Sequence, residues 1–169
     1  MPQTRRTHLK MLGASLGLST LPSGLMASDD TTTDAPKTHV VEMLNKHPED
    51  SKQRNVFVPD ILRAKPGDTI RFVTVDKGHN SASAANMLPE GGQTWDGKIS
   101  KDVEVTLTTE GAYGYYCTPH RSLGMVGLIL VGDVSGNYDA VKAVRQRGKA
   151  KTVYADIFTR ADALLAAEA

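Results

Sequence analysis

Four side chains in the second half of the sequence could together bind a transition metal. Cys117, His120 and Met125 follow one another closely, and His79 precedes the cysteine by 38 positions. They offer one thiolate, two imidazoles and one thioether. Two imidazole nitrogens and a thiolate around the metal, with a weak axial thioether, are the donor set of a blue-copper electron-transfer site. The four residues therefore predict one copper ion that cycles between copper(I) and copper(II).

Each of these residues also has a simpler explanation. A histidine at the start of a loop is usually a surface residue, and a methionine before an apolar strand usually packs in the core. A cysteine at the end of a strand is often a small buried hydrophobe. Cys-x-x-His could also be a nucleophile beside its general base. We favour copper because all four donors fall at the ends of expected strands and Cys117 is the only cysteine.

The first 27 residues predict an export signal. Arg5 and Arg6 are followed by Leu-Lys and then by a mildly apolar run from Met11 to Ala27, as in a twin-arginine signal peptide. Glycine and proline dilute this run, and it is too short to span a membrane. We expect residues 1–27 to be removed and the mature protein, without a membrane span, to be periplasmic. An unpaired cysteine in an oxidising compartment needs burial or a bound metal.

The charge balance argues against a nucleic-acid binder. The whole chain carries a formal charge of only +1, without the strong basic excess that such proteins show. Residues 1–27 hold three basic and no acidic side chains, so the remainder has 17 basic and 19 acidic ones and a charge near −2. We expect the mature chain to be a slightly acidic monomer.

Short strands dominate the rest of the sequence. Residues 28–37 are polar and predict a flexible linker, which leaves 38–169 as one domain. Apolar and polar residues alternate clearly over 102–108, which is typical of a half-buried strand. Several similar runs are separated by Gly, Pro and Asp turns, so we predict an all-β Greek-key sandwich. The expected strands cover residues 39–44, 55–58, 61–64, 69–75, 102–108, 112–117 and 126–131.

The pattern changes after Gly136. Val141 and Val144 at helical spacing predict a helix over 138–147. A run rich in Ala and Leu predicts a second helix over 159–167, with Thr159 as its N-cap and Asp162 as the acid of a capping box. We expect both helices to pack against the sandwich.

The segments around the candidate ligands resemble the pseudoazurins, a family of cupredoxins. The resemblance covers about residues 39–167 and includes the two-helix tail, which plastocyanins and amicyanins lack. It implies a cupredoxin fold and the ligands His79, Cys117, His120 and Met125. The matching segments are Met43–Lys46, Lys65–Thr69, Asp76–Asn80, Cys117–His120, Gly124–Gly127 and Gly132–Asp133.

The resemblance also implies a function. Pseudoazurins are periplasmic carriers of single electrons and not enzymes, and they bind copper nitrite reductase or c-type cytochromes transiently. A periplasmic copper storage or delivery protein is the alternative, although such proteins usually carry exposed sites rich in Met or His, and this chain has none. The sequence departs from the family in two places. Arg121–Leu123 replaces the usual Tyr-Gly-Met, and Tyr116 stands where a lysine often precedes the cysteine.

Further site residues are expected around the metal. The resemblance implies that Asn80 bridges the histidine loop to the cysteine loop. Pro119 has no N–H to donate, so it should limit hydrogen bonding near the sulfur. Because His120 lies in the loop, we expect it to be the exposed ligand and His79 to be buried, so that electrons leave through the edge of His120. An apolar collar around that edge should comprise Met87, Pro89, Pro119 and Leu123. A basic ring for partner docking should comprise Lys46, Lys77, Lys98, Lys101 and Arg121.

Overall fold

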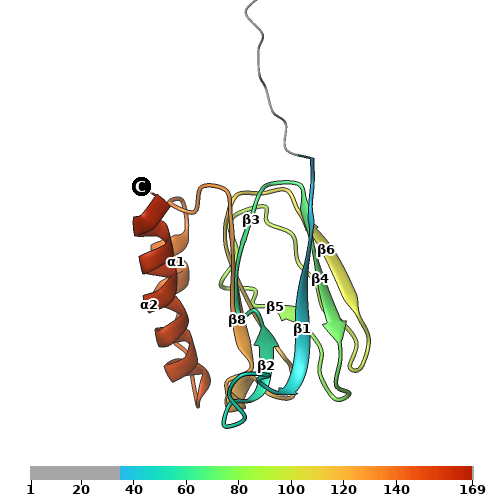
Figure 1. Cartoon of the computed structure of the whole chain (residues 1–169). Helices are drawn as coiled ribbons and strands as arrows, with labels where there is room; N and C mark the ends of the chain where they lie inside the picture. Colours follow the sequence, from blue (N-terminus) through green and yellow to red (C-terminus); the bar gives the residue numbers. More distant parts are fainter. Residues whose placement is uncertain (1–34, 169) are drawn as a thin grey trace, which may run out of the picture. The chain divides into compact units, whose positions relative to one another are not determined.

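Two facing β-sheets and a pair of helices make up the part of the chain that the structure describes. A computed structural model describes residues 35–168, so the expected leader and most of the expected linker lie outside the described residues. Each sheet has four strands, and the helices lie beside one sheet (Figure 1). The predicted cupredoxin sandwich with C-terminal helices is therefore confirmed.

The first sheet has the strand order β2-β1-β4-β6. Strands β1 and β4 run parallel, and the other two pairs are antiparallel. Alternation places one face in the core: Val41, Met43, Ile70 and Phe72 are fully buried, whereas Glu42 between them is exposed. The strands are β1 (Thr38–Lys46), β2 (Arg54–Val58), β4 (Asp68–Thr74) and β6 (Val103–Leu107).

The second sheet is covered on both faces. Its order is β3-β8-β7-β5, and every residue of β8 is buried. Ile129 and Val131 of β8 join the core between the sheets, while Leu128 and Leu130 pack with the helices. The strands are β3 (Ile61–Ala64), β5 (Ala82–Ser83), β7 (Gly111–Tyr116) and β8 (Val126–Val131). Strand β5, with only two residues, was not expected from the sequence.

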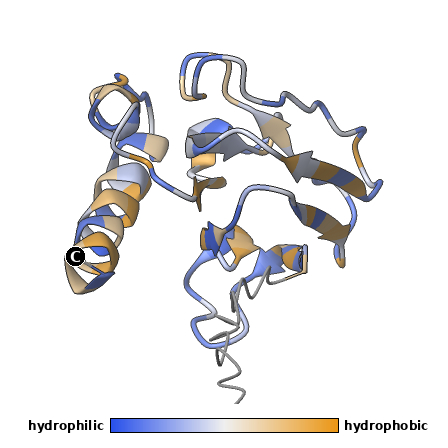
Figure 2. Ribbon diagram, turned by 90° about the horizontal axis from the view of Figure 1, so that it is seen from above, coloured by the Kyte–Doolittle hydropathy of each residue, from blue (hydrophilic) through white to orange (hydrophobic). Residues whose placement is uncertain are grey.

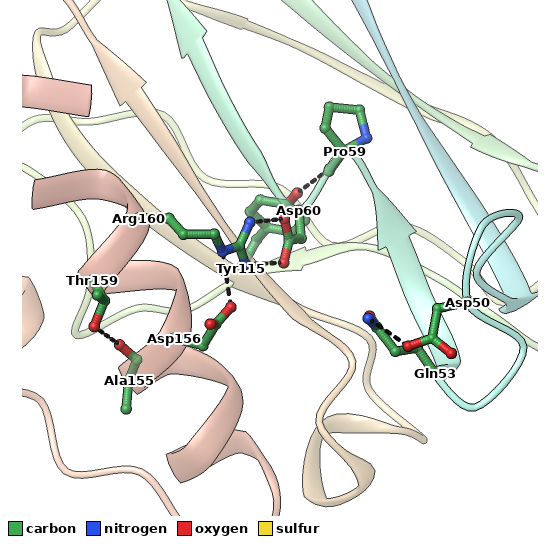
Figure 3. Close-up of polar contacts among 9 residues, drawn as sticks. All are labelled: Asp50, Gln53, Pro59, Asp60, Tyr115, Ala155, Asp156, Thr159 and Arg160. Carbon is green, nitrogen blue, oxygen red and sulfur yellow. Dashed lines mark hydrogen bonds and ion pairs between the residues drawn. The ribbon is translucent and has the colours of Figure 1, made fainter. Parts of the chain in front are cut away.

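The helices are α1 (Tyr138–Lys142) and α2 (Ala150–Glu168), so the predicted end of the first helix and the predicted start of the second were wrong. Helix α1 ends at Lys142 rather than at residue 147. Helix α2 begins at Ala150, so Thr159 lies in its interior, where its hydroxyl donates to the Ala155 carbonyl at 2.9 Å instead of capping the helix (Figure 3). Figure 2 shows both helices on one side of the sandwich.

Helix α2 is joined to the sandwich by an apolar stripe and by ion pairs. Its buried residues Tyr154, Ile157, Phe158 and Ala161 follow the spacing of one helical face. On its outer side, both terminal nitrogens of Arg160 donate to the Asp60 carboxylate at 2.9 and 2.7 Å (Figure 3). At its C-terminal end, Glu168 pairs with Arg63 of β3 at 2.9 Å. The helix is thus held along its length.

Candidate metal centre

Three donor atoms meet at one end of the sandwich. The Nδ1 atoms of His79 and His120 are 3.0 Å apart, and the Cys117 Sγ lies 3.9 and 3.5 Å from them. His79 and Cys117 are fully buried, whereas His120 is partly exposed. Within residues 35–168, this is the only group of three or more His, Cys, Asp or Glu side chains close enough to share a metal ion.

The loop after β4 fixes the position of His79. The Asp76 amide donates to the Met43 carbonyl of β1 at 3.1 Å, and the Ser100 amide donates to the His79 carbonyl at 2.7 Å. The ring itself is held by Asn45, whose Oδ1 accepts from His79 Nε2 at 3.0 Å. Because Nε2 carries the proton, the lone pair on Nδ1 is directed at the other donors. Asn45 was not identified as a site residue from the sequence.

The loop from β7 to β8 carries the other ligands. The Cys117 amide donates to the Met125 carbonyl at 3.0 Å, and the Met125 amide donates to the His120 carbonyl at 3.1 Å. Between them lies the short 3-10 helix η1 (Arg121–Leu123). Met125 is fully buried in the same core cluster as Cys117. The two bonds close the loop and fix the spacing of its three ligands.

Helix α2 supports this loop from outside. Gly124 has a φ of 93°, which favours glycine, and a Cβ there would lie 2.9 Å from Val153 of α2. The Lys149 amide also donates to the Ser122 carbonyl at 3.0 Å. The metal-binding loop is therefore packed against the helical tail and not suspended in solvent.

Asn80 joins the two ligand loops, as the family resemblance implies. Its Oδ1 accepts from the Thr118 amide at 2.8 Å, and its Nδ2 donates to the Thr118 hydroxyl at 3.0 Å. The side chain is buried. Pro119, which follows Thr118 in the chain, is exposed. The influence of Asn80 and Pro119 on the reduction potential stays a prediction.

The electrostatics of the site favour metal binding over nucleophilic catalysis. Burial raises the pKa of the Cys117 thiol, although the backbone N–H groups of Asn80 and His120 act in the opposite direction. Burial and the neighbouring His120 lower the pKa of His79. A buried thiol with a raised pKa is a poor nucleophile at neutral pH, whereas a bound cation stabilises the thiolate. Neutral imidazole is the form that ligates metals, so the donor set fits copper.

The predicted docking residues fall into two groups. Lys46, Lys77, Lys98 and Lys101 are exposed, and within residues 35–168 none of them pairs with a carboxylate. Leu123, at 50% exposure, lies in the loop beside His120. These positions agree with a docking role but do not test it.

Arg121 is not a free member of this ring. Its guanidinium lies 4.5 Å from the centre of the Tyr116 ring, and one of its nitrogens donates to the Gln146 Oε1 at 3.3 Å. Arg121 and Tyr116, which both depart from the family pattern, therefore contact each other. The bond from Arg121 to Gln146 attaches the metal-binding loop to the tail. A cation over an aromatic ring stabilises by about 0.5–2 kcal/mol.

The expected collar is wrong at Met87. This side chain is fully buried beneath Gly114, where a Cβ would lie 2.7 Å from its methyl carbon. The Gln146 amide nitrogen lies 3.1 Å from its sulfur. Met87 therefore packs under the second sheet and cannot contact a partner. Pro89 is partly buried.

The sandwich and its donor set define a blue-copper protein of the cupredoxin class. The sequence profile of the copper binding proteins of the plastocyanin/azurin family matches residues 43–132. The pseudoazurin of Paracoccus pantotrophus is 45% identical over 114 residues, which cover 68% of this chain and 77% of that protein. The chain therefore belongs to the pseudoazurins, within the plastocyanin/azurin family.

Solved structures agree with this assignment. A Sinorhizobium pseudoazurin superposes with a TM-score of 0.69 at 45% identity, covering 72% of this chain and 94% of that one. The pseudoazurin of Hyphomicrobium denitrificans gives a TM-score of 0.68 at 36% identity, covering 73% and 97%. The chain thus holds a type 1 copper site of His79, Cys117, His120 and Met125, and it is an electron carrier rather than an enzyme. Across residues 35–168, no helix has the length and apolar character needed to cross a membrane.

Proposed function

We propose that this chain is a periplasmic, monomeric carrier that delivers single electrons to a copper nitrite reductase or exchanges them with a c-type cytochrome. The observation that carries this proposal is the unequal exposure of the ligands. His79, Cys117 and Met125 are fully buried, and only His120 reaches the surface. A partner can therefore approach one edge of the site, and solvent cannot reach the rest.

Copper supplies the one-electron couple when it is bound, and the chain's own residues keep its surroundings constant. Asn45 fixes the ring of His79, Asn80 ties the two ligand loops together, and backbone bonds close the loop from Cys117 to Met125. Ligands that cannot rearrange lower the structural cost of each electron transfer. His79, Cys117, His120 and Met125 would hold the copper ion and would leave no position for a substrate, which agrees with a carrier.

The partner would dock around His120. Leu123 offers an apolar contact next to the ligand, and Lys46, Lys77, Lys98 and Lys101 are exposed cations without carboxylate partners in the described chain. Such charges orient an acidic partner before contact and raise the association rate more than the final affinity. The interaction would be transient because it depends on few apolar contacts.

Storage or delivery of copper is the second candidate, and the site argues against it. A delivery protein must release its cargo, whereas the described residues hold one buried set of ligands with a single partly exposed histidine. Adding copper(II) to the purified mature protein separates the two. A carrier turns intensely blue and is bleached by ascorbate, and Cys117→Ser removes the blue band. A pale complex would favour storage.

Stopped-flow mixing of the reduced protein with a copper nitrite reductase tests the proposed partner. Lys77→Glu should slow the reaction severalfold near 0.01 M ionic strength and matter little above 0.1 M, because the screening length falls from about 30 Å to about 10 Å. The double variant Ala163→Glu/Ala166→Glu changes the net charge equally, but on the exposed C-terminal part of α2. A rate that does not depend on salt would contradict docking through a basic ring.

A further inference from the structure

The segment between the two helices lies at the metal-binding end of the molecule. Residues 143–149 connect α1 to α2 and contact the loop that carries His120. Two hydrogen bonds join the segments: Lys149 donates its amide to the Ser122 carbonyl at 3.0 Å, and Arg121 donates to Gln146 at 3.3 Å. Any large partner that covers His120 therefore also meets this segment.

This part of the tail is strongly basic. No acidic residue occurs between Asp139 and Asp156, and five basic ones do. Four of them, Arg145, Arg147, Lys149 and Lys151, are exposed, and within residues 35–168 they form no ion pair. We call Arg145, Arg147 and Lys151, which line the hollow described below, the tail cations. They are notable because residues 28–169 together carry a charge near −2.

The tail cations surround an open hollow of about 700 Å³. Its walls include the apolar side chains of Val144, Tyr154 and Phe158. The single acid at the hollow, Asp162, is already bound by Lys142 at 2.7 Å and by the hydroxyl of Tyr138 at 2.8 Å. The hollow therefore presents positive charge around an apolar interior, without a carboxylate free to neutralise it.

We propose that the tail cations form a second docking patch, which binds an acidic segment of the redox partner while the partner's redox centre faces His120. This inference rests on the proposed function and adds the tail to the docking surface. A carboxylate-bearing segment fits the rim, and an aliphatic or aromatic side chain of that segment fits the hollow. Two separate patches would fix the orientation of the partner, which one ring around His120 does not do.

An acidic protein fits better than other polyanions. A nucleic acid or an anionic membrane extends far beyond the patch and would meet the rest of a slightly acidic chain. A protein partner places its negative charge only where the cations are. The hydrogen-bonded contact between the tail and the metal-binding loop also puts the patch within the area that a partner at His120 covers.

The main experiment compares charge variants of the copper-loaded protein. Arg145→Gln/Arg147→Gln should lower the second-order rate with copper nitrite reductase roughly threefold or more near 0.01 M ionic strength, since steering by local charge accelerates association by 10-fold to 10³-fold. Arg145→Lys/Arg147→Lys keeps the charge and should match the wild type. Ala163→Glu/Ala166→Glu matches the loss of charge at the other end of α2 and should have a much smaller effect. The proposal would be overturned if Arg145→Gln/Arg147→Gln left the rate unchanged. It would also be overturned if Ala163→Glu/Ala166→Glu lowered the rate by the same factor.

A second measurement does not need the reductase. The amide NMR signals of the ¹⁵N-labelled copper(I) protein are recorded while a ten-residue glutamate-rich peptide containing one phenylalanine is added. Shifts at residues 144–151 that disappear in Arg145→Gln/Arg147→Gln would support the docking patch. A wild type that fails to reduce the reductase would refute only the proposed partner. The proposal would be overturned if the signals of residues 144–151 did not shift. It would also be overturned if the only effect of Arg145→Gln/Arg147→Gln were a loss of binding to phosphatidylglycerol vesicles.

Discussion

At the scale of single residues, the ring of His79 is held through both nitrogens. Nδ1 faces the other donors and Nε2 donates to Asn45, which lies on β1. Partners of this kind orient a ligating imidazole and raise its basicity. The bond therefore contributes to copper affinity, although Asn45 does not bind the metal.

Replacing Asn45 should weaken copper binding without unfolding the protein. Asn45→Ala leaves Nε2 without its acceptor, and losses of such outer partners typically cost about 10- to 100-fold in metal affinity. Competition with a copper(I) chelator measures the change, and Asn45→Asp, which keeps an acceptor oxygen, serves as the matched variant. An affinity equal to the wild type in Asn45→Ala would show that the backbone alone positions His79.

Met125 allows a test of the axial ligand. Met125→Gln places a harder oxygen donor in the same buried position, and such a donor favours copper(II) over copper(I). The midpoint potential measured by voltammetry should fall while the blue band remains. If the potential is unchanged or higher, Met125 serves only as core packing.

At the scale of elements, helix α2 is part of the core and not an appendage. Ile157 is fully buried against the second sheet, whereas Leu164 on the same helix is 44% exposed. The two residues provide a matched pair for mutation, because truncation to alanine changes a buried contact in one and a surface contact in the other.

Ile157→Ala should lower the free energy of unfolding by about 2–5 kcal/mol, because it removes buried methyl groups and leaves a cavity. Leu164→Ala should change it by no more than about 0.5 kcal/mol. Urea unfolding of both variants measures the difference. Similar small losses in the two would mean that the helix adds little to the stability of the sandwich.

The strands could be predicted closely from the sequence, and α2 could not. Alternation identified β6 because Val103, Val105 and Leu107 share one face. In α2, the apolar stripe from Tyr154 to Ala161 is present in the sequence. The start of the helix was nevertheless predicted at Thr159, because the residues after it are richer in Ala and Leu. The four ligands could be proposed because a thiolate, a thioether and two imidazoles all fall at the ends of expected strands. Asn45 could not, since only the parallel pairing of β1 with β4 brings it to His79 from 34 positions away.

At the scale of the whole molecule, a buried carboxylate fastens the start of the domain. Asp68, at 3% exposure, accepts from the amides of Lys37 and Lys65 at 2.8 and 2.9 Å and lies 2.7 Å from His39 Nε2. Burial alone would raise the pKa of Asp68, but these hydrogen bonds outweigh it and lower the pKa to about 2. The carboxylate thus joins β1 to the turn before β4.

This lowered pKa predicts how stability depends on acid. The folded-state pKa of Asp68 lies below its ordinary value of 3.8, so its contribution is complete above that value and is lost as the pH falls toward 2. The loss should amount to about 2 kcal/mol, since one pKa unit corresponds to about 1.4 kcal/mol. Urea unfolding between pH 2 and 5 measures it. In Asp68→Asn the dependence on pH over this range should be weaker, and an identical slope would contradict the assignment.

The bond between Lys149 and Ser122 has a consequence for measurement. The Lys149 amide belongs to the tail, yet its acceptor lies within the metal-binding loop. This amide can exchange with deuterated solvent only when the loop and the tail separate. Its exchange rate therefore reports how often the loop opens. The rate can be measured in the copper-loaded and in the metal-free protein, because it does not depend on the blue absorption.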